Sequence, residues 1–458
     1  MKLVKSLLLG TAAGIAAVAG AQAADLPSRK AAPVEYVRVC TAYGAGFFYI
    51  PGTDSCLRIS GRVRAEYAVG QRYSDYQDAY GTRARGRLNI DVRTATAYGT
   101  LRTFIRYELT NNTGIYTAGT GPFNTGANVP GLVRGAAGTG SLLDLAYVQF
   151  GPITAGRAQS FFDFYASDLN FASIRTADSR VNLLAYTATF GSGFSATVSL
   201  EDRTSGTVGR ELGGVIGGIG FLGTAAAVTQ GQDYPDIVAS LRVDQGWGSA
   251  QLSGAVGQRK YAAVGAAALG AVDGDEVAWA IQGGVKINLP MLAAGDALWL
   301  QAAYADGALG YLGWSGNSLG LGRLGRLTLA DASINPVTGK VDNSTGWSFV
   351  AAFRHFWTPT LRTEIGASYS ELKLGYIDNA TAAFALVPRS LDPKEFLLAA
   401  NLIWSPVSGL DIGVEVLYSH LDVRSPVGLV NNASVRSNLL GIKSEDSISG
   451  RLRIQRDF

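Results

Sequence analysis

Residues 83–93 read RARGRLNIDVR, and charged or polar residues alternate strictly with apolar ones along this stretch. Successive side chains of a β-strand point to opposite faces of its sheet. A strand formed here would carry four arginines, an asparagine and an aspartate on one face, and only alanine, glycine, leucine, isoleucine and valine on the other. The stretch therefore predicts a strand that separates a basic environment from an apolar one.

The same alternation recurs in most strand-like segments, most clearly in Leu57–Tyr67 (LRISGRVRAEY) and Thr100–Asn111. We count about sixteen such segments, joined alternately by short turns and by long glycine-rich loops. No helical pattern remains to cover the apolar face, so that face requires a nonpolar solvent. We therefore expect an all-β fold, a transmembrane antiparallel β-barrel whose closure leaves no unpaired edge in lipid.

The alternation of short and long connections also predicts the orientation of this barrel. Outer-membrane barrels have short turns on the periplasmic side and long loops on the extracellular side. An even number of strands brings both ends of the chain to the same side, where the first and last strands can pair. A barrel of this size encloses an aqueous channel.

The first residues have the organisation of a signal peptide. Lys2 and Lys5 precede an apolar run, and Ala21–Ala23 forms a small-residue cleavage site. Beyond this segment no apolar run reaches the roughly 18 residues that a transmembrane helix needs. We divide the chain into a signal peptide (1–23), an N-terminal leader (24–56) and the barrel (57–458).

The chain has two cysteines, Cys40 and Cys56. In an exported protein two nearby cysteines are usually bonded, and a disulfide closing so short a loop contributes roughly 3 kcal/mol in the chain-entropy model. We expect a disulfide-stapled segment ahead of the first strand, with two free thiols as the alternative.

Composition argues against several other classes of protein. The formal net charge is only +3, so charge alone indicates no nucleic-acid partner. The two histidines, His355 and His420, are accompanied by no nucleophile motif and no metal-ligand spacing. We expect no enzyme, no cofactor and no metal site.

The run Cys40–Tyr67, CTAYGAGFFYIPGTDSCLRISGRVRAEY, resembles the N-terminal signature of the alphaproteobacterial general porins. The chain ends with SISGRLRIQRDF, and Phe458 resembles the terminal aromatic residue by which the barrel-assembly machinery recognises its clients. The resemblance implies a homotrimer of sixteen-stranded barrels in the bacterial outer membrane, in contact with lipid and lipopolysaccharide. Each barrel would pass small hydrophilic solutes and ions by passive diffusion.

In such porins the third outer loop folds into the lumen and narrows it, and by our count this loop is Phe161–Arg180. Strand parity and loop order then predict the charged groups of the constriction, some of whose arginines must pair with Glu66, Asp91, Glu108 or the loop acids. The predicted basic wall consists of Arg58, Arg62, Arg64, Arg83, Arg85, Arg87, Arg93, Arg102, Arg106, Arg451 and Arg453. The predicted acids of the inner loop are Asp163, Asp168 and Asp178.

Two other functions remain open at this point. A substrate-selective channel of the sugar type would use aromatic residues along the lumen, and Phe161, Phe162, Phe164 and Tyr165 on the inner loop could serve that purpose. A non-conducting barrel would act as a structural anchor or adhesin. The sequence leaves the pore radius, the ion preference and the preferred solute undetermined.

Overall fold

The structure of the chain is a computed structural model, which describes residues 38–71, 78–116, 138–205, 214–216, 226–229, 231–264, 272–314, 329–334, 340–374, 392–424 and 443–458. The chain divides between Cys56 and Leu57 into two units, which we describe separately. The predicted signal peptide, residues 1–23, lies outside the described residues.

The described part of the first unit is a short disulfide-bonded segment. It contains the 3-10 helix η2 (Thr41–Tyr43) and the strand β1 (Phe48–Tyr49). A disulfide joins Cys40 to Cys56, whose Cα atoms are 6.0 Å apart, and Phe47 is buried beside it. The predicted disulfide is therefore confirmed.

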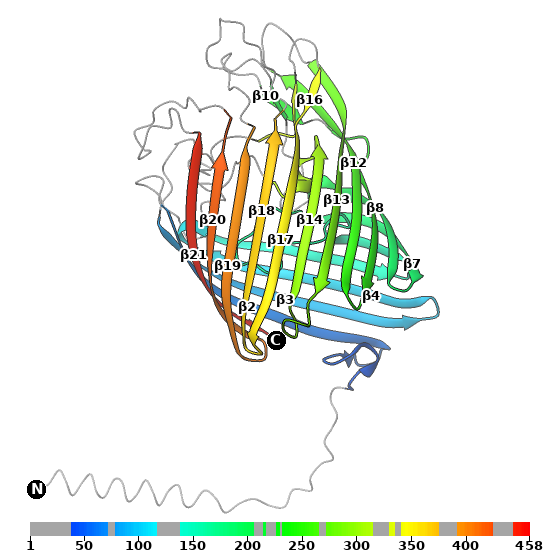
Figure 1. The fold of residues 1–458 in the computed structure, drawn as a ribbon. Helices are drawn as coiled ribbons and strands as arrows, with labels where there is room; N and C mark the ends of the chain where they lie inside the picture. The colour runs from blue at the N-terminus through cyan, green and yellow to red at the C-terminus, as the bar shows by residue number, and fades with distance from the viewer. Residues whose placement is uncertain are drawn as a thin grey trace, which may run out of the picture. The chain divides into compact units, whose positions relative to one another are not determined.

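The second unit is a closed antiparallel barrel (Figure 1). Among the described residues, sixteen strands form its wall. In order around the barrel they are β2 (Ser55–Gly70), β3 (Tyr80–Thr96), β4 (Gly99–Asn112), β5 (Gly138–Phe150), β6 (Ile153–Gln159), β7 (Arg180–Gly191), β8 (Phe194–Asp202), β11 (Asp236–Gln245), β12 (Gly248–Val264), β13 (Val272–Asn288), β14 (Ala297–Asp306), β17 (Thr345–Thr358), β18 (Leu361–Lys373), β19 (Lys394–Val407), β20 (Leu410–Asp422) and β21 (Ser444–Asp457). Each strand pairs with the next, and β21 returns to pair with β2 in a register that matches Arg62 to Asp457. The predicted barrel and its strand number are confirmed.

Smaller elements occupy the connections at the end of the barrel where the long loops emerge. They are η3 (Gly114–Tyr116), η4 (Arg203–Ser205), η5 (Leu309–Leu312), β9 (Gly214–Ile216), β10 (Ala226–Thr229), β15 (Ala332–Ile334) and β16 (Val341–Asn343). β9 and β10 lie in one of the long glycine-rich connections that the sequence indicates as loops, so the structure differs from that expectation there. β10 pairs with the far end of β12 and so extends the barrel sheet, whereas β9 and β15 pair in a separate three-stranded sheet with β16.

The strands expose apolar side chains on the outside and turn polar side chains inward. On β2, Val63 and Tyr67 are exposed while Glu66 between them is buried. On β20, Val414 and Val416 are exposed on either side of the buried Glu415. This alternation suits a wall with hydrocarbon on one side and water on the other.

Aromatic residues mark both ends of the outward face. On β17, Trp347 and Trp357 are exposed near opposite ends of the strand. Amphipathic rings of this kind favour the two water–lipid boundaries. No helix among the described residues is long and apolar enough to cross a membrane.

The connection between β6 and β7, residues 160–179, lies inside the barrel. Its backbone is hydrogen-bonded to inward-facing side chains of β12, β14 and β20, and Phe162 and Tyr165 on it are fully buried against the wall. The rings of Phe162 and Tyr311 meet with centroids 4.5 Å apart, so η5 packs on the loop. The apolar core of this protein is therefore built where the inner loop packs on the wall.

Candidate functional site

An arginine-rich sector of wall lies on the four neighbouring strands β21, β2, β3 and β4. Strand parity turns its arginines toward the lumen, and the apolar residues between them, such as Leu88 and Leu452, are exposed on the outer face. The arginines of this sector are Arg62 and Arg64 on β2, Arg83, Arg85, Arg87 and Arg93 on β3, Arg102 and Arg106 on β4, and Arg451 and Arg453 on β21.

The centre of this sector is organised around one buried carboxylate. Glu66 accepts a hydrogen bond from Arg83 Nε at 2.5 Å and another from Arg453 Nε at 2.8 Å. Arg451 Nη1 lies 3.7 Å from the same carboxylate. Three guanidinium groups thus share a single negative charge, which leaves a local excess of positive charge.

Two other carboxylates of the sector, Asp91 and Glu108, each lie against two arginines. Asp91 accepts hydrogen bonds from Arg93 at 2.8 Å and from Arg102 at 3.0 Å. Glu108 accepts a 2.5 Å hydrogen bond from Arg87 Nε and lies 3.4 Å from Arg85. The expected pairing with Glu66, Asp91 and Glu108 is present, and it explains how so many arginines can lie side by side.

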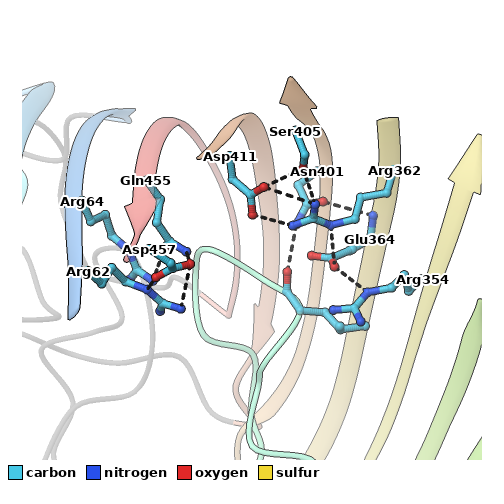
Figure 2. Close-up of polar contacts among 11 residues, drawn as sticks. Arg62, Arg64, Arg354, Arg362, Glu364, Asn401, Ser405, Asp411, Gln455 and Asp457 are labelled. Atoms are coloured by element: carbon cyan, nitrogen blue, oxygen red, sulfur yellow. Dashed lines mark hydrogen bonds and ion pairs between the residues drawn. The ribbon is translucent and has the colours of Figure 1, made fainter. Parts of the chain in front are cut away.

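The seam between the first and last strands is bridged by polar side chains (Figure 2). Arg62 on β2 contacts Asp457 on β21 at 2.5 Å, and Arg64 donates to the amide oxygen of Gln455 at 2.8 and 3.0 Å. Among the described residues Arg64 forms no salt bridge, since Gln455 is uncharged.

A second basic group, on β17 and β18, was missed by the sequence analysis. Glu364 on β18 accepts from Arg354 Nε at 2.7 Å and from Arg362 Nε at 3.2 Å, and Arg362 also reaches Asp411 at 2.8 Å (Figure 2). Strand parity could have identified these two arginines, because each lies on the inward face of its strand.

The inner loop is attached to the wall by side chains that bind its backbone. Gln251 and Ser253 on β12 donate to the carbonyl of Phe162 at 3.3 and 2.9 Å, and Gln301 on β14 accepts from Tyr165 N at 2.9 Å. Asn401 on β19 donates to the carbonyl of Leu169 at 3.0 Å. These contacts fix the loop along the β12–β19 side of the lumen.

The far end of the loop is bound where the arginine-rich sector begins. Glu415 on β20 accepts hydrogen bonds from the backbone N–H groups of Phe171 and Ala172, both at 2.5 Å. Arg453 stacks over the Phe171 ring with its guanidinium carbon 4.0 Å from the ring centroid, and donates to the Phe171 carbonyl at 3.1 Å. The loop therefore reaches across the lumen to β20 and β21 before it returns to β7.

Comparison with known proteins decides the family. Residues 25–450 match the model of the porin subfamily. The chain belongs to the porin subfamily. Over 329 residues it is 35% identical to porin Omp2b of Brucella abortus (strain 2308) and to porin Omp2b of Brucella melitensis biotype 1, covering 69% of this chain and 78% of each relative. The fold is similar to the outer membrane channel DcaP of Acinetobacter baumannii, with a TM-score of 0.58 and 16% identity over 90% of this chain and 99% of that one.

This porin is a multi-pass β-barrel of the bacterial outer membrane and a channel for passive diffusion, rather than an enzyme. Its barrel places the three predicted loop acids in different surroundings. Asp163 is buried at the base of the loop, where it accepts a hydrogen bond from Ser179 N at 2.7 Å. Asp168 is exposed at a loop bend. Asp178 is half-buried and pairs with Arg180, and burial raises the pKa of its carboxyl above the usual range in spite of that arginine.

Arg58 differs from the other arginines predicted for the wall of this porin. It is exposed near the start of β2, ahead of the segment that pairs with β21 from Arg62 onward. Its place in the strand is at the end with the short turns, away from the contacts that hold the inner loop.

Proposed function

We propose that solutes cross this porin between the arginine-rich sector and the inner loop, and that this passage is the narrow part of the channel. The observation that carries the proposal is the path of the loop, which is bonded to β12, β14, β19 and β20 while the arginines lie on β21 and β2–β4. Asp168 is the exposed loop acid in this arrangement, with Asp178 half-buried beside Arg180. A transverse field between opposite charges would orient polar solutes and slow apolar ones.

Thiol labelling tests this passage, because both native cysteines are bonded and the chain has no free thiol. In an Asp168→Cys variant, a bulky thiol reagent added during recording in a planar bilayer should lower the conductance in discrete steps, one for each labelled pore. Ser408→Cys, on an exposed short turn, is the matched control and should show no step. An unchanged conductance after complete labelling at position 168 would exclude the proposed passage.

The assembly and partners implied by the family resemblance also remain proposals. We propose a homotrimer in contact with outer-membrane lipid and lipopolysaccharide, assembled by machinery that recognises Phe458. Gel electrophoresis of unheated samples tests the trimer, and a single band at the mass of one chain under conditions that keep the barrel folded would contradict it. Small hydrophilic solutes are the proposed cargo, and no catalytic role is proposed.

The other two functions considered from the sequence gain no specific support. Phe162 and Tyr165 of the inner loop are fully buried against the wall, so these two rings are not available as an aromatic lining for sugars. A non-conducting barrel predicts no current from folded protein in a bilayer, which the same recordings would detect.

A further inference from the structure

We infer that the channel favours small anions over small cations, because the carboxylates of its wall lie deeper than the guanidinium groups that pair with them. The inference rests on the proposed function and specifies its substrate class, namely small carboxylates, phosphates and inorganic anions. Both the depth of these charges and the local excess of arginines around Glu66 favour anions.

In each of the following ion pairs of the wall, the carboxylate side chain is less exposed to solvent than its arginine partner. The Glu66 side chain is 0% exposed, whereas those of Arg83 and Arg451 are 16% and 20% exposed. Glu108 is 4% exposed against 25% for Arg85. The pairs of Arg93 with Asp91, Arg106 with Asp144 and Arg354 with Glu364 have the same order. Water in the lumen therefore meets the cation of each of these pairs first.

Side-chain length explains this order. On an inward-facing strand position a carboxylate stays close to the sheet, whereas the longer arginine side chain extends over it. Each guanidinium has five N–H groups, so binding one carboxylate leaves donors free to face the lumen. An ion in the water-filled space is closer to the positive end of each pair, so the two charges do not cancel.

Two further cationic side chains lie on β13 and β17, on the side of the wall that holds the inner loop. Lys286 on β13 forms no salt bridge among the described residues, and its Nζ lies 5.1 Å from the centroid of the Trp299 ring. The guanidinium carbon of Arg354 lies 5.9 Å from the same ring. Two cations held near one indole ring add to the positive potential on this side.

The acidic side chains that are more exposed lie either near the short turns or on the inner loop. Asp244, Asp411 and Asp457 are near the short turns, with side chains that are more exposed than those of their arginine partners. Asp168 and Asp178 belong to the inner loop. The strand positions along the middle of the arginine-rich sector thus present guanidinium groups, while the loop presents the opposing negative charge.

Reversal potentials in a planar bilayer with a KCl gradient test the inference. We expect chloride to permeate better than potassium. Neutralising cations that have no salt bridge, in Arg64→Gln and separately in Lys286→Gln, should each lower the chloride-to-potassium permeability ratio by about twofold. Arg456→Gln, on the exposed outer face of β21, is the matched control and should leave the ratio unchanged. Asp168→Asn should raise the ratio.

The possible results distinguish failure of the anion preference from failure of the proposed diffusion channel. A conducting channel that prefers potassium, or Arg64 and Lys286 variants that both keep the native ratio, would overturn the anion preference while leaving the diffusion channel in place. Folded protein that carries no current would instead refute the proposed function itself. Replacing chloride by acetate or phosphate then measures the preference within the anion class.

Discussion

Gly61 on β2 and Phe458 at the end of the chain exchange two backbone hydrogen bonds, Gly61 N to Phe458 O at 2.8 Å and Phe458 N to Gly61 O at 3.0 Å. The Phe458 ring lies over the glycine, and a Cβ atom added at Gly61 would lie 2.5 Å from Phe458 Cζ and 2.6 Å from the carbonyl oxygen of Arg87. The last residue thus extends the pairing that closes the barrel, and it does so over a position that has no room for a side chain.

The first prediction concerns this closure. Gly61→Ala should destabilise the barrel by about 1–3 kcal/mol, because the backbone of Arg87 cannot move aside for the new methyl group. Gly86→Ala on β3 is the control, since a Cβ there meets no atom within 4 Å. Thermal unfolding in detergent, followed by the β-sheet signal, should show a lower midpoint for the first variant only. Equal midpoints would mean that the seam adapts to a side chain.

The second prediction concerns the attachment of the inner loop. In Glu415→Gln the amide can accept from one of the two N–H groups of Phe171 and Ala172 but offers an N–H to the other, which costs about 1–3 kcal/mol. The loop should detach more often, and single-channel recordings should show larger fluctuations of the open current.

Glu371→Gln is the control for this variant. Glu371 pairs with Lys394 near the rim of the barrel and has no bond to the loop. Fluctuations that increase equally in both variants would show that loss of charge, rather than release of the loop, is responsible.

The third prediction concerns pH. Burial raises the pKa of Asp178, which is faced by Arg180, Gln159 and Asp144, so this group takes up its proton at a higher pH than the usual aspartate value of 3.8. Protonation removes a negative charge from the loop. The chloride-to-potassium permeability ratio should therefore rise as pH falls toward this range, and Asp178→Asn should already have the higher ratio at neutral pH. A native ratio that falls on acidification would contradict the assignment.

The fourth prediction concerns a buried ionic cluster where β11 begins. Asp236 accepts from Arg203 Nη1 at 3.1 Å and from the Tyr311 hydroxyl at 2.8 Å, and Arg259 lies 3.6 Å away. Removing the charge in Asp236→Asn leaves buried arginines undercompensated, which should destabilise the protein by about 3–5 kcal/mol. Asp202→Asn, at an exposed position, should cost far less in the same thermal unfolding measurement. Similar losses in both would argue against a structural role for the cluster.

The sequence predicted the barrel because alternation is a local property. Each residue of the stretch 83–93 shows by its parity which solvent it faces, and the same rule correctly assigned the outer face of β2. The same reasoning could have found Arg354 and Arg362, whose strands follow the rule equally well. The disulfide was predictable for a similar reason, because its two cysteines lie close together in the chain.

The surroundings of the inner loop could not be predicted from local sequence patterns. Its position in the chain was predicted, but three aspartates on it could not be ranked. Asp163 is buried at the base of the loop, whereas Asp168 is exposed, and this difference depends on contacts with strands that follow 90 to 244 residues later in the chain. No periodicity within residues 161–180 encodes those contacts.

By itself the sequence determined which side chains of this porin face lipid and which face water, since a strand alternates its faces at every residue. Only the tertiary structure decided how deep each charge lies, which wall holds the inner loop and how Phe458 meets Gly61. Those features depend on the register between strands and on the path of a loop across the lumen. Both are set by contacts between distant parts of the chain. Which carboxylate pairs with which arginines, and which of the two is more exposed, therefore follows only from the closed barrel.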